Sequence, residues 1–169
     1  MVPLQKTFKL CGCVAVLLLT AMASHLAAAE VILQPTPDEG FQPRLVQAED
    51  GSVHLLYFKK RLNRPAAREG SLYYRQYLPE QNGFGLPVRV SSQAFNLQTV
   101  AISRATMAIG SDGRIHVMWY LPREAQYFYT RSTPDRSAFE AQRSIVSINT
   151  EGIDAAGDVA AIGNQVAIV

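Results

Sequence analysis

The stretch Arg44-Leu-Val-Gln-Ala-Glu-Asp-Gly-Ser-Val-His-Leu-Leu-Tyr-Phe58 decides the fold of this chain, because it occurs again. The second copy, 62 residues further on, reads Thr106-Met-Ala-Ile-Gly-Ser-Asp-Gly-Arg-Ile-His-Val-Met-Trp-Tyr120. The Asp-Gly pair, the β-branched residue two places on, the histidine and the aromatic pair keep the same offsets. A weaker third copy runs from Gly157 to Val169. A repeat of this size is typical of one supersecondary unit stacked several times, as in solenoids and propellers.

Each copy predicts a strand, a tight turn and a second strand. Asp50-Gly51 and Asp112-Gly113 stand between apolar runs, which is a strong hairpin signal because glycine tolerates a positive φ. Gly163-Asn164 takes this place in the third copy. The third strand is expected at residues 72–77 in the first copy and 126–131 in the second. The fourth strand is expected at residues 87–91 and 143–147. We therefore expect four antiparallel strands in each complete repeat.

The second strand of the repeat distinguishes between all-β architectures. Residues 53–58 and 115–120 form continuous apolar runs that only the histidines interrupt, and such a run indicates a strand covered on both faces. The blades of a β-propeller have that environment, whereas a two-sheet sandwich is the alternative for about 140 residues. We expect a propeller that is incomplete here, with blades at 41–92 and 103–148 and a third beginning at 156–169. Because a propeller needs at least four blades and the chain stops inside a strand pattern, we expect an N-terminal piece of a longer protein.

Residues 1–29 have the pattern of a secretory signal peptide. Lys6 and Lys9 precede an almost uncharged apolar run at 10–23, and Ala27-Ala28-Ala29 supplies the small residues of a cleavage site. The apolar run is shorter than the roughly 20 residues of a spanning helix. We expect a secreted or periplasmic protein that begins at Glu30 and has no membrane span after cleavage.

Composition excludes several classes of partner and site. Both cysteines, Cys11 and Cys13, lie in the leader, so the mature chain has no disulfide and no thiolate metal site. Without the two leader lysines, the chain has fourteen basic and fourteen acidic residues. This balance gives no indication of nucleic acid or of an anionic membrane surface as a partner.

The order of these segments resembles the sialidase-like β-propellers with BNR repeats, over about residues 41–169. Pro43-Arg-Leu-Val leads to the first Asp-Gly hairpin, then come Leu72-Tyr-Tyr-Arg75 and Leu86-Pro-Val-Arg-Val-Ser91. The hallmark of that family is the Asp box, Ser-x-Asp-x-Gly-x-Thr-Trp/Phe, between the third and fourth strands. Ser132-Thr-Pro-Asp-Arg-Ser-Ala-Phe139 stands there with matching Ser and Phe, while Pro134, Arg136 and Ala138 replace the Asp, Gly and Thr.

The resemblance implies a central channel lined by the first strand of each blade. Its functional face would be formed by the loops that enter those strands and the loops between the second and third strands. Guanidinium groups bind carboxylates bidentately, so arginines on that face imply an acidic sugar or another carboxylate as ligand. The candidates are Arg44, Arg61, Arg104 and Arg123. For the basic loop 59–68 that contains Arg61, an ordinary solvated surface loop is the alternative.

The resemblance also raises the question of sialidase activity. Pro43-Arg44-Leu45 stands at the place of the first carboxylate-binding arginine, and Arg61 at that of the second. The acid/base Asp expected after it is absent, since Glu69 and Glu80 are the only acids between Asp50 and Asp112. We expect a protein that binds an acidic glycan or an exported protein partner. The alternative is a glycoside hydrolase of the exo-sialidase type whose remaining catalytic residues lie beyond residue 169.

Other combinations of residues indicate no further chemistry. His54 and His116 occupy one repeated strand position among apolar residues, where a buried histidine with a satisfied ring nitrogen is expected instead of a metal ligand. Asp154 and Asp158 precede the first strand of the third repeat and are the best-placed acids on the expected functional face. We expect no metal and no cofactor.

Overall fold

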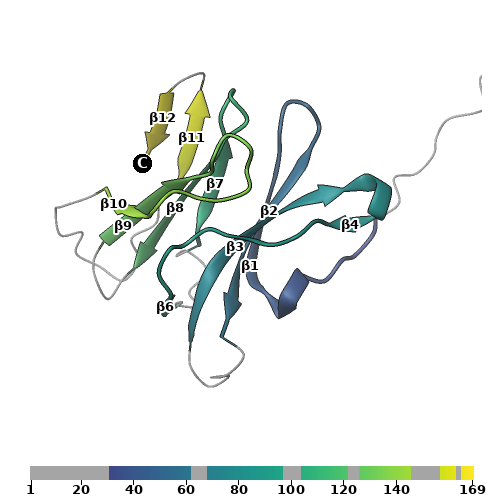
Figure 1. The fold of residues 1–169 in the computed structure, drawn as a ribbon, viewed down its shortest axis with the longest axis horizontal. Coiled ribbons are helices and arrows are strands. Elements are labelled where there is room, and N and C mark those ends of the chain that lie inside the picture. Colours follow the sequence, from purple (N-terminus) through teal and green to yellow (C-terminus); the bar gives the residue numbers. More distant parts are fainter. Residues whose placement is uncertain (1–30, 62–67, 97–103, 122–125, 146–156, 163–164) are drawn as a thin grey trace, which may run out of the picture. The chain divides into compact units, whose positions relative to one another are not determined.

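The computed structural model of the protein describes residues 31–61, 68–96, 104–121, 126–145, 157–162 and 165–169. The chain divides into two compact units, Met1–Gln34 and Pro35–Val169, and every strand belongs to the second. The described part of this unit is all-β, with antiparallel sheets and two short 3-10 turns, η1 (Pro37–Glu39) and η2 (Pro79–Gln81) (Figure 1). Among the described residues, no helix has the length and apolar character needed to cross a membrane.

Sheet 1 corresponds to the first repeat, but its outer part differs from the prediction. It contains β1 (Phe41–Gln47), β2 (Val53–Lys60), β3 (Glu69–Leu78), β4 (Gly83–Phe84), β5 (Val88–Arg89) and β6 (Phe95–Asn96). Three short strands, β4, β5 and β6, share the outer edge of the long β3, where we expected one strand at 87–91. The edge is broken at 85–87 because Pro87 has no N–H to donate and the Gly85 carbonyl accepts the Arg75 side chain at 3.0 Å.

Sheet 2 corresponds to the second repeat and has the four antiparallel strands that we predicted. Its order is β10 (Arg143–Ser144), β9 (Gln126–Arg131), β8 (Ile115–Leu121) and β7 (Thr106–Ile109). Sheet 3 is the hairpin of β11 (Val159–Ile162) and β12 (Gln165–Ile168), which confirms the third copy as a strand pair. The turn expected at Gly163-Asn164 lies outside the described residues.

The Asp-Gly turns have the backbone that the sequence predicts. Gly51 and Gly113 have φ values of 84° and 75°, in the left-handed region that favours glycine. In both turns the glycine N–H donates to the carbonyl three residues earlier, Ala48 in the first and Gly110 in the second. The aspartate before each glycine accepts the N–H two residues on. The same local chemistry therefore ends the first strand and begins the second in both repeats.

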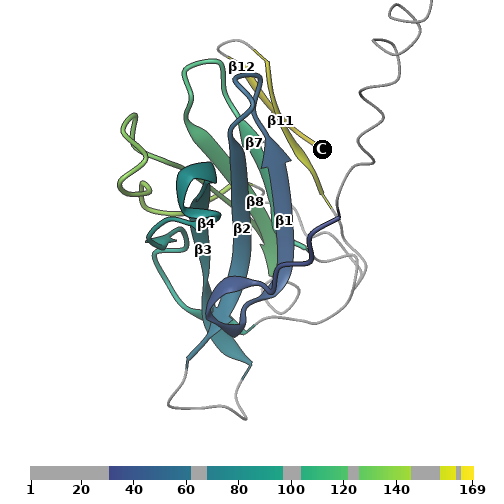
Figure 2. The same ribbon diagram turned by 90° about the vertical axis from the view of Figure 1, so that its right-hand side faces the viewer.

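The core lies between sheets 1 and 2. Alternate residues of β8, among them Val117 and Trp119, join Leu56 and Phe58 of β2 in one buried cluster, and Trp119 stacks on Phe95 of β6 at 6.1 Å. All seven residues of β8 are buried, as are five consecutive residues of β2. β11 contacts β8 on the face opposite this cluster. Figure 2 shows β1, β7 and β11 along one side of the sheets. The prediction that the second strands are covered on both faces is therefore confirmed for β8.

Candidate functional site

One end of the sheets contains the starts of the first strands, which we call the strand-start end. Because β1 and β2 are antiparallel, with Phe41 opposite Phe58 and Gln47 opposite Val53, the start of β1 lies beside the end of β2. β1 begins at Phe41, so Arg44 is the fourth of its seven residues and not the strand start that the sequence predicted. The exposed Arg104 lies two residues before β7. Arg61 follows β2 at the same end. Arg123 and Asp154 lie outside the described residues.

Arg44 follows a bulge that separates it from the first residue of its strand. The ladder between β1 and β2 shifts between Phe41 and Arg44, where Gln42 has a φ of 50° and Pro43 has no N–H. The Arg44 side chain is 44% exposed, and its Nη2 lies 4.0 Å from Oδ1 of the 58% exposed Asp158. The chain thus brings the first strand of repeat 1 close to the residue that precedes the first strand of repeat 3. An ion pair this exposed contributes little, about 0–1 kcal/mol, so the guanidinium keeps donors for a ligand.

The basic residues around Arg61 have partners within sheet 1 and its N-terminal segment. Arg61 Nη1 lies 3.0 Å from Glu69 Oε1, and the Arg61 N–H donates to the Glu69 carbonyl. Lys59 lies 3.6 Å from Asp38, and Lys60 lies over the ring of Phe41 at 4.8 Å. These contacts are those of an ordinary charged surface, which favours the solvated-surface alternative for Lys59, Lys60 and Arg61.

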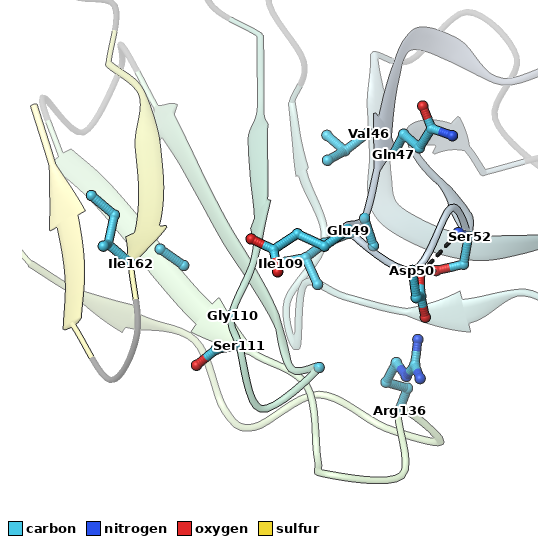
Figure 3. A pocket seen from close by; sticks show the side chains of 13 residues that line it. Val46, Gln47, Glu49, Asp50, Ser52, Ile109, Gly110, Ser111, Arg136 and Ile162 are labelled. Carbon is cyan, nitrogen blue, oxygen red and sulfur yellow. Dashed lines mark hydrogen bonds between the residues drawn. The ribbon is translucent and has the colours of Figure 1, made fainter.

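A pocket of about 470 Å³ lies at the opposite end of the first strands, and we call it the hairpin-end pocket (Figure 3). Its apolar lining comes from the last residues of the three first strands: Val46, Ile109 and Ile162. Its polar lining comes from the two Asp-Gly turns and from the loop after β9: Glu49, Asp50, Ser52, Ser111 and Arg136. Figure 3 shows the Asp50 carboxylate and the Arg136 guanidinium pointing toward each other. No pattern in the sequence predicted this pocket.

A chain of hydrogen bonds leads from this pocket into the core. The Ser52 N–H and hydroxyl donate to Asp50 Oδ1 at 2.9 and 2.6 Å, and the Ser52 hydroxyl lies 2.8 Å from His54 Nε2. His54 Nδ1 lies 2.7 Å from the Tyr74 hydroxyl. Burial lowers the pKa of His54, and Arg136 lowers it further. His54 is therefore a neutral, fully buried ring with both nitrogens satisfied, which confirms the structural role predicted for it.

His116 repeats this arrangement in the second sheet. Its Nδ1 lies 2.7 Å from the Tyr129 hydroxyl, and burial lowers its pKa. Arg114 replaces Ser52 at the equivalent position, and its side chain is turned instead to Glu140 at 2.6 Å. A second cavity of about 450 Å³ lies beside His116, bordered by β12. Across the described ranges, no group of three or more His, Asp or Glu side chains is arranged to hold a metal ion.

The loop that carries Arg136 is the segment aligned with the Asp box. Ser132 occupies its expected place, since its hydroxyl accepts the Ile115 N–H at 3.0 Å and it bridges to Phe139. The carboxylate comes one residue later than in the family motif. Asp135 accepts hydrogen bonds from the Thr133 and Ser137 hydroxyls, and these bonds lower its pKa to about 2. Arg136 then has a φ of 60°, the left-handed conformation suited to the motif's glycine.

In the sequence Arg136 is only a departure from the motif, yet the turn aims its side chain at the other sheet. The charge of Arg136 acts on Asp50, His54 and Tyr74, all of which belong to the first repeat. Across the described ranges, no carboxylate lies within 4.0 Å of its guanidinium. The sequence signal that could have identified this residue is Asp135 with hydroxyl residues two places away on each side, which predicts a rigid turn.

The fold defines an all-β protein built from repeated antiparallel hairpins, and comparisons with known proteins do not define its class further. No family model matches the chain, and no curated protein matches it. Among solved structures, the chain resembles one titled "Crystal structure of polysaccharide lyase Uly1", with a TM-score of 0.36 and 17% sequence identity. The match covers 68% of this chain, which spans only 27% of that one. A likeness of this size carries no argument about activity.

Proposed function

We propose that this chain is an exported protein of the sialidase-like β-propeller type that binds an acidic ligand, such as an acidic glycan, at the strand-start end. The propeller interpretation is supported by the succession of contacts, since β1 contacts β7 and β7 contacts β11. It is also supported by the repeated His–Tyr pair, which gives sheets 1 and 2 the same internal geometry. An exported protein at the same face is the other partner class that this arrangement suits.

The observation that carries the ligand class is the convergence of charged groups from different repeats. Arg44 and Asp158 are more than a hundred residues apart in the sequence, yet their side chains approach to 4.0 Å. Arg104 precedes β7, which lies in contact with both β1 and β11. Two arginines on neighbouring first strands could bind a carboxylate through charge-assisted hydrogen bonds, and Asp158 acts as a weak internal competitor.

A titration with acidic sugars tests this proposal. Isothermal titration calorimetry with N-acetylneuraminic acid, glucuronic acid and galacturonic acid should detect binding that Arg44→Ala weakens by about 1.5–3 kcal/mol, the scale of hydrogen bonds to a charged group. This corresponds to a loss of about tenfold to a hundredfold or more. Asp158→Asn should strengthen binding up to about fivefold, because it removes an exposed ion pair with Arg44.

The matched control is Arg89→Ala. Arg89 lies on the short outer strand β5 and donates to the Ser71 hydroxyl at 3.1 Å, away from the first strands. Its removal should leave ligand binding unchanged. Equal effects of Arg44→Ala and Arg89→Ala would contradict the assignment, as would the absence of binding by all three acidic sugars.

Export rests on the sequence of residues 1–29. Its test is N-terminal sequencing of the protein from the medium and the periplasm of an expressing bacterium. The expected N-terminus is Glu30. Recovery of the chain with Met1 intact in the cytosol would contradict this part of the proposal.

Hydrolysis of the sialidase type is the alternative activity. Glycoside hydrolysis needs two groups at a defined separation, and Glu69 is the described acid nearest the expected acid/base position. In the structure Glu69 begins β3 and forms an ion pair with Arg61. Release of the fluorophore from a sialic acid conjugate, lost in Glu69→Gln, would favour hydrolysis over binding alone.

A further inference from the structure

The hairpin-end pocket has the chemistry of a second ligand site, at the ends of the first strands and not at their starts. Its volume of about 470 Å³ falls within the range of roughly 300–1,000 Å³ that is typical of small-molecule sites. Three separate hairpins and the loop after β9 contribute to it. It is therefore a product of packing between the repeats and not a groove along one strand.

The polar groups of this pocket are held in place before any ligand arrives. Asp50 is fixed by two hydrogen bonds from Ser52, which in turn contacts the buried His54. The backbone at Arg136 is held by its turn, in which Asp135 accepts from Thr133 and Ser137, and the Arg136 side chain hydrogen-bonds the Tyr74 hydroxyl. A side chain that already has a partner and stands on a rigid turn loses less conformational freedom on binding than a free side chain on a flexible loop. The structure thus presents a donor and an acceptor side by side in the pocket.

The charges of the pocket select the class of ligand. Glu49 and Asp50 are acceptors when ionised, whereas the Arg136 guanidinium only donates. An anion would meet the two carboxylates, and a cation would meet the guanidinium. A hydroxyl group satisfies both kinds of partner, because it donates and accepts at once.

The remaining wall of the pocket suits the C–H face of a sugar ring. Val46, Ile109 and Ile162 line it with aliphatic side chains, and Ile162 is 76% exposed. Sugars combine hydroxyl groups around the ring with apolar C–H surfaces above and below it, so they match a pocket with polar groups beside an aliphatic wall. We propose that the hairpin-end pocket binds an uncharged sugar, with Arg136, Asp50 and Glu49 contacting its hydroxyls and the aliphatic wall covering its ring.

The test is a titration of the full chain with glucose, galactose, N-acetylglucosamine and cellobiose, followed by calorimetry and by ligand-observed NMR. At least one of these sugars should bind, and Arg136→Gly should weaken its binding tenfold or more. Glycine is the informative replacement because it keeps the left-handed backbone at φ 60° and removes only the side chain. Glu49→Gln, which keeps the size of an exposed side chain, should weaken binding to a smaller extent.

Arg44→Ala is the matched control and separates this proposal from the proposed function. It should leave the binding of uncharged sugars unchanged, just as Arg136→Gly should leave the binding of acidic sugars unchanged. If no uncharged sugar binds at millimolar concentration, the proposal is overturned while the acidic-ligand site stands on its own test. If uncharged sugars bind but Arg44→Ala abolishes their binding and Arg136→Gly does not, the ligand lies at the other end and the proposal is equally overturned.

Discussion

Acidification from pH 7.5 to 5.5 should destabilise this protein through its two buried histidines. His54 is 0% exposed and His116 is 6% exposed. Burial is the main cause that lowers the pKa of both rings, whereas Asp50 and Asp112 respectively oppose the shift. A second proton on either ring would also force the tyrosine hydroxyl 2.7 Å away to act as an acceptor. Each histidine is therefore stable in the fold as the neutral ring.

The sign and size follow from proton linkage. The unfolded histidine has a pKa of about 6.5, and the folded pKa of each ring lies below that value. Above pH 6.5 both states are neutral and the free energy of unfolding is at its full value. As the pH falls toward the folded pKa, the unfolded chain binds more protons, and each histidine lowers the free energy of unfolding by up to about 1.4 kcal/mol per pH unit. The two together give at most about 2.7 kcal/mol per unit.

Urea denaturation followed by tryptophan fluorescence provides the assay. Trp119 is the single tryptophan and is 2% exposed, so its emission reports the opening of the core. The urea midpoint should fall between pH 7.5 and 5.5, before the carboxylates titrate. His54→Gln and His116→Gln should each reduce the dependence of the midpoint on pH by about half, whatever their effect at pH 7.5. A midpoint that is unchanged or rises over this range would refute the reasoning, as would an unaltered pH dependence in both variants.

Two further predictions concern the backbone and a polar cluster. Gly113→Ala should lower the free energy of unfolding by about 1–2 kcal/mol, because an added Cβ meets no atom within 4 Å and only the φ of 75° opposes it. Gly83→Ala, whose Cβ would make an ordinary 3.6 Å contact, should change the urea midpoint little. Equal effects of Gly113→Ala and Gly83→Ala would contradict the role given to the positive φ of Gly113. Asp38→Asn should cost about 1.5–3 kcal/mol, since Asp38 Oδ2 accepts from the Tyr57 hydroxyl at 2.6 Å and from Arg75 at 2.7 Å. The hydrogen bond from the Tyr57 hydroxyl is the main cause that lowers the pKa of Asp38. The contribution of Asp38 to the free energy of unfolding should therefore disappear as the pH falls below about 3.8. A urea midpoint that Asp38→Asn leaves unchanged at pH 7 would contradict this prediction.

The repeated hairpins could be predicted because their signals are local. A left-handed glycine after an aspartate fixes the turn within five residues, and the structure has that turn at Gly51 and at Gly113. The continuous apolar run of the second strand correctly predicted burial on both faces of β8. The position of His54 and His116 within these runs was sufficient to predict buried rings, each with a satisfied ring nitrogen.

The outer edge of sheet 1 could not be predicted in the same way. The short strands there depend on which partner each backbone group finds. The Gly85 N–H donates to the Gln76 carbonyl of β3, but the Gly85 carbonyl accepts from the Arg75 side chain instead of from a strand. The strand-start end was predicted only in part. The sequence placed Arg44 and Asp158 at the starts of different strands, but their approach to 4.0 Å depends on how repeats 1 and 3 pack.

The sequence alone determined the elements of this protein: an all-β chain of repeated Asp-Gly hairpins whose second strands are buried. Backbone preferences and apolar patterning act over a few residues, so they can be read from the chain directly. Only the tertiary structure decided where the repeats meet. Arg136 shows the difference, since its turn is local but the pocket it enters contains Asp50, which precedes it by more than eighty residues. That pocket arises from side-chain packing between sheets, which joins residues that no local pattern relates.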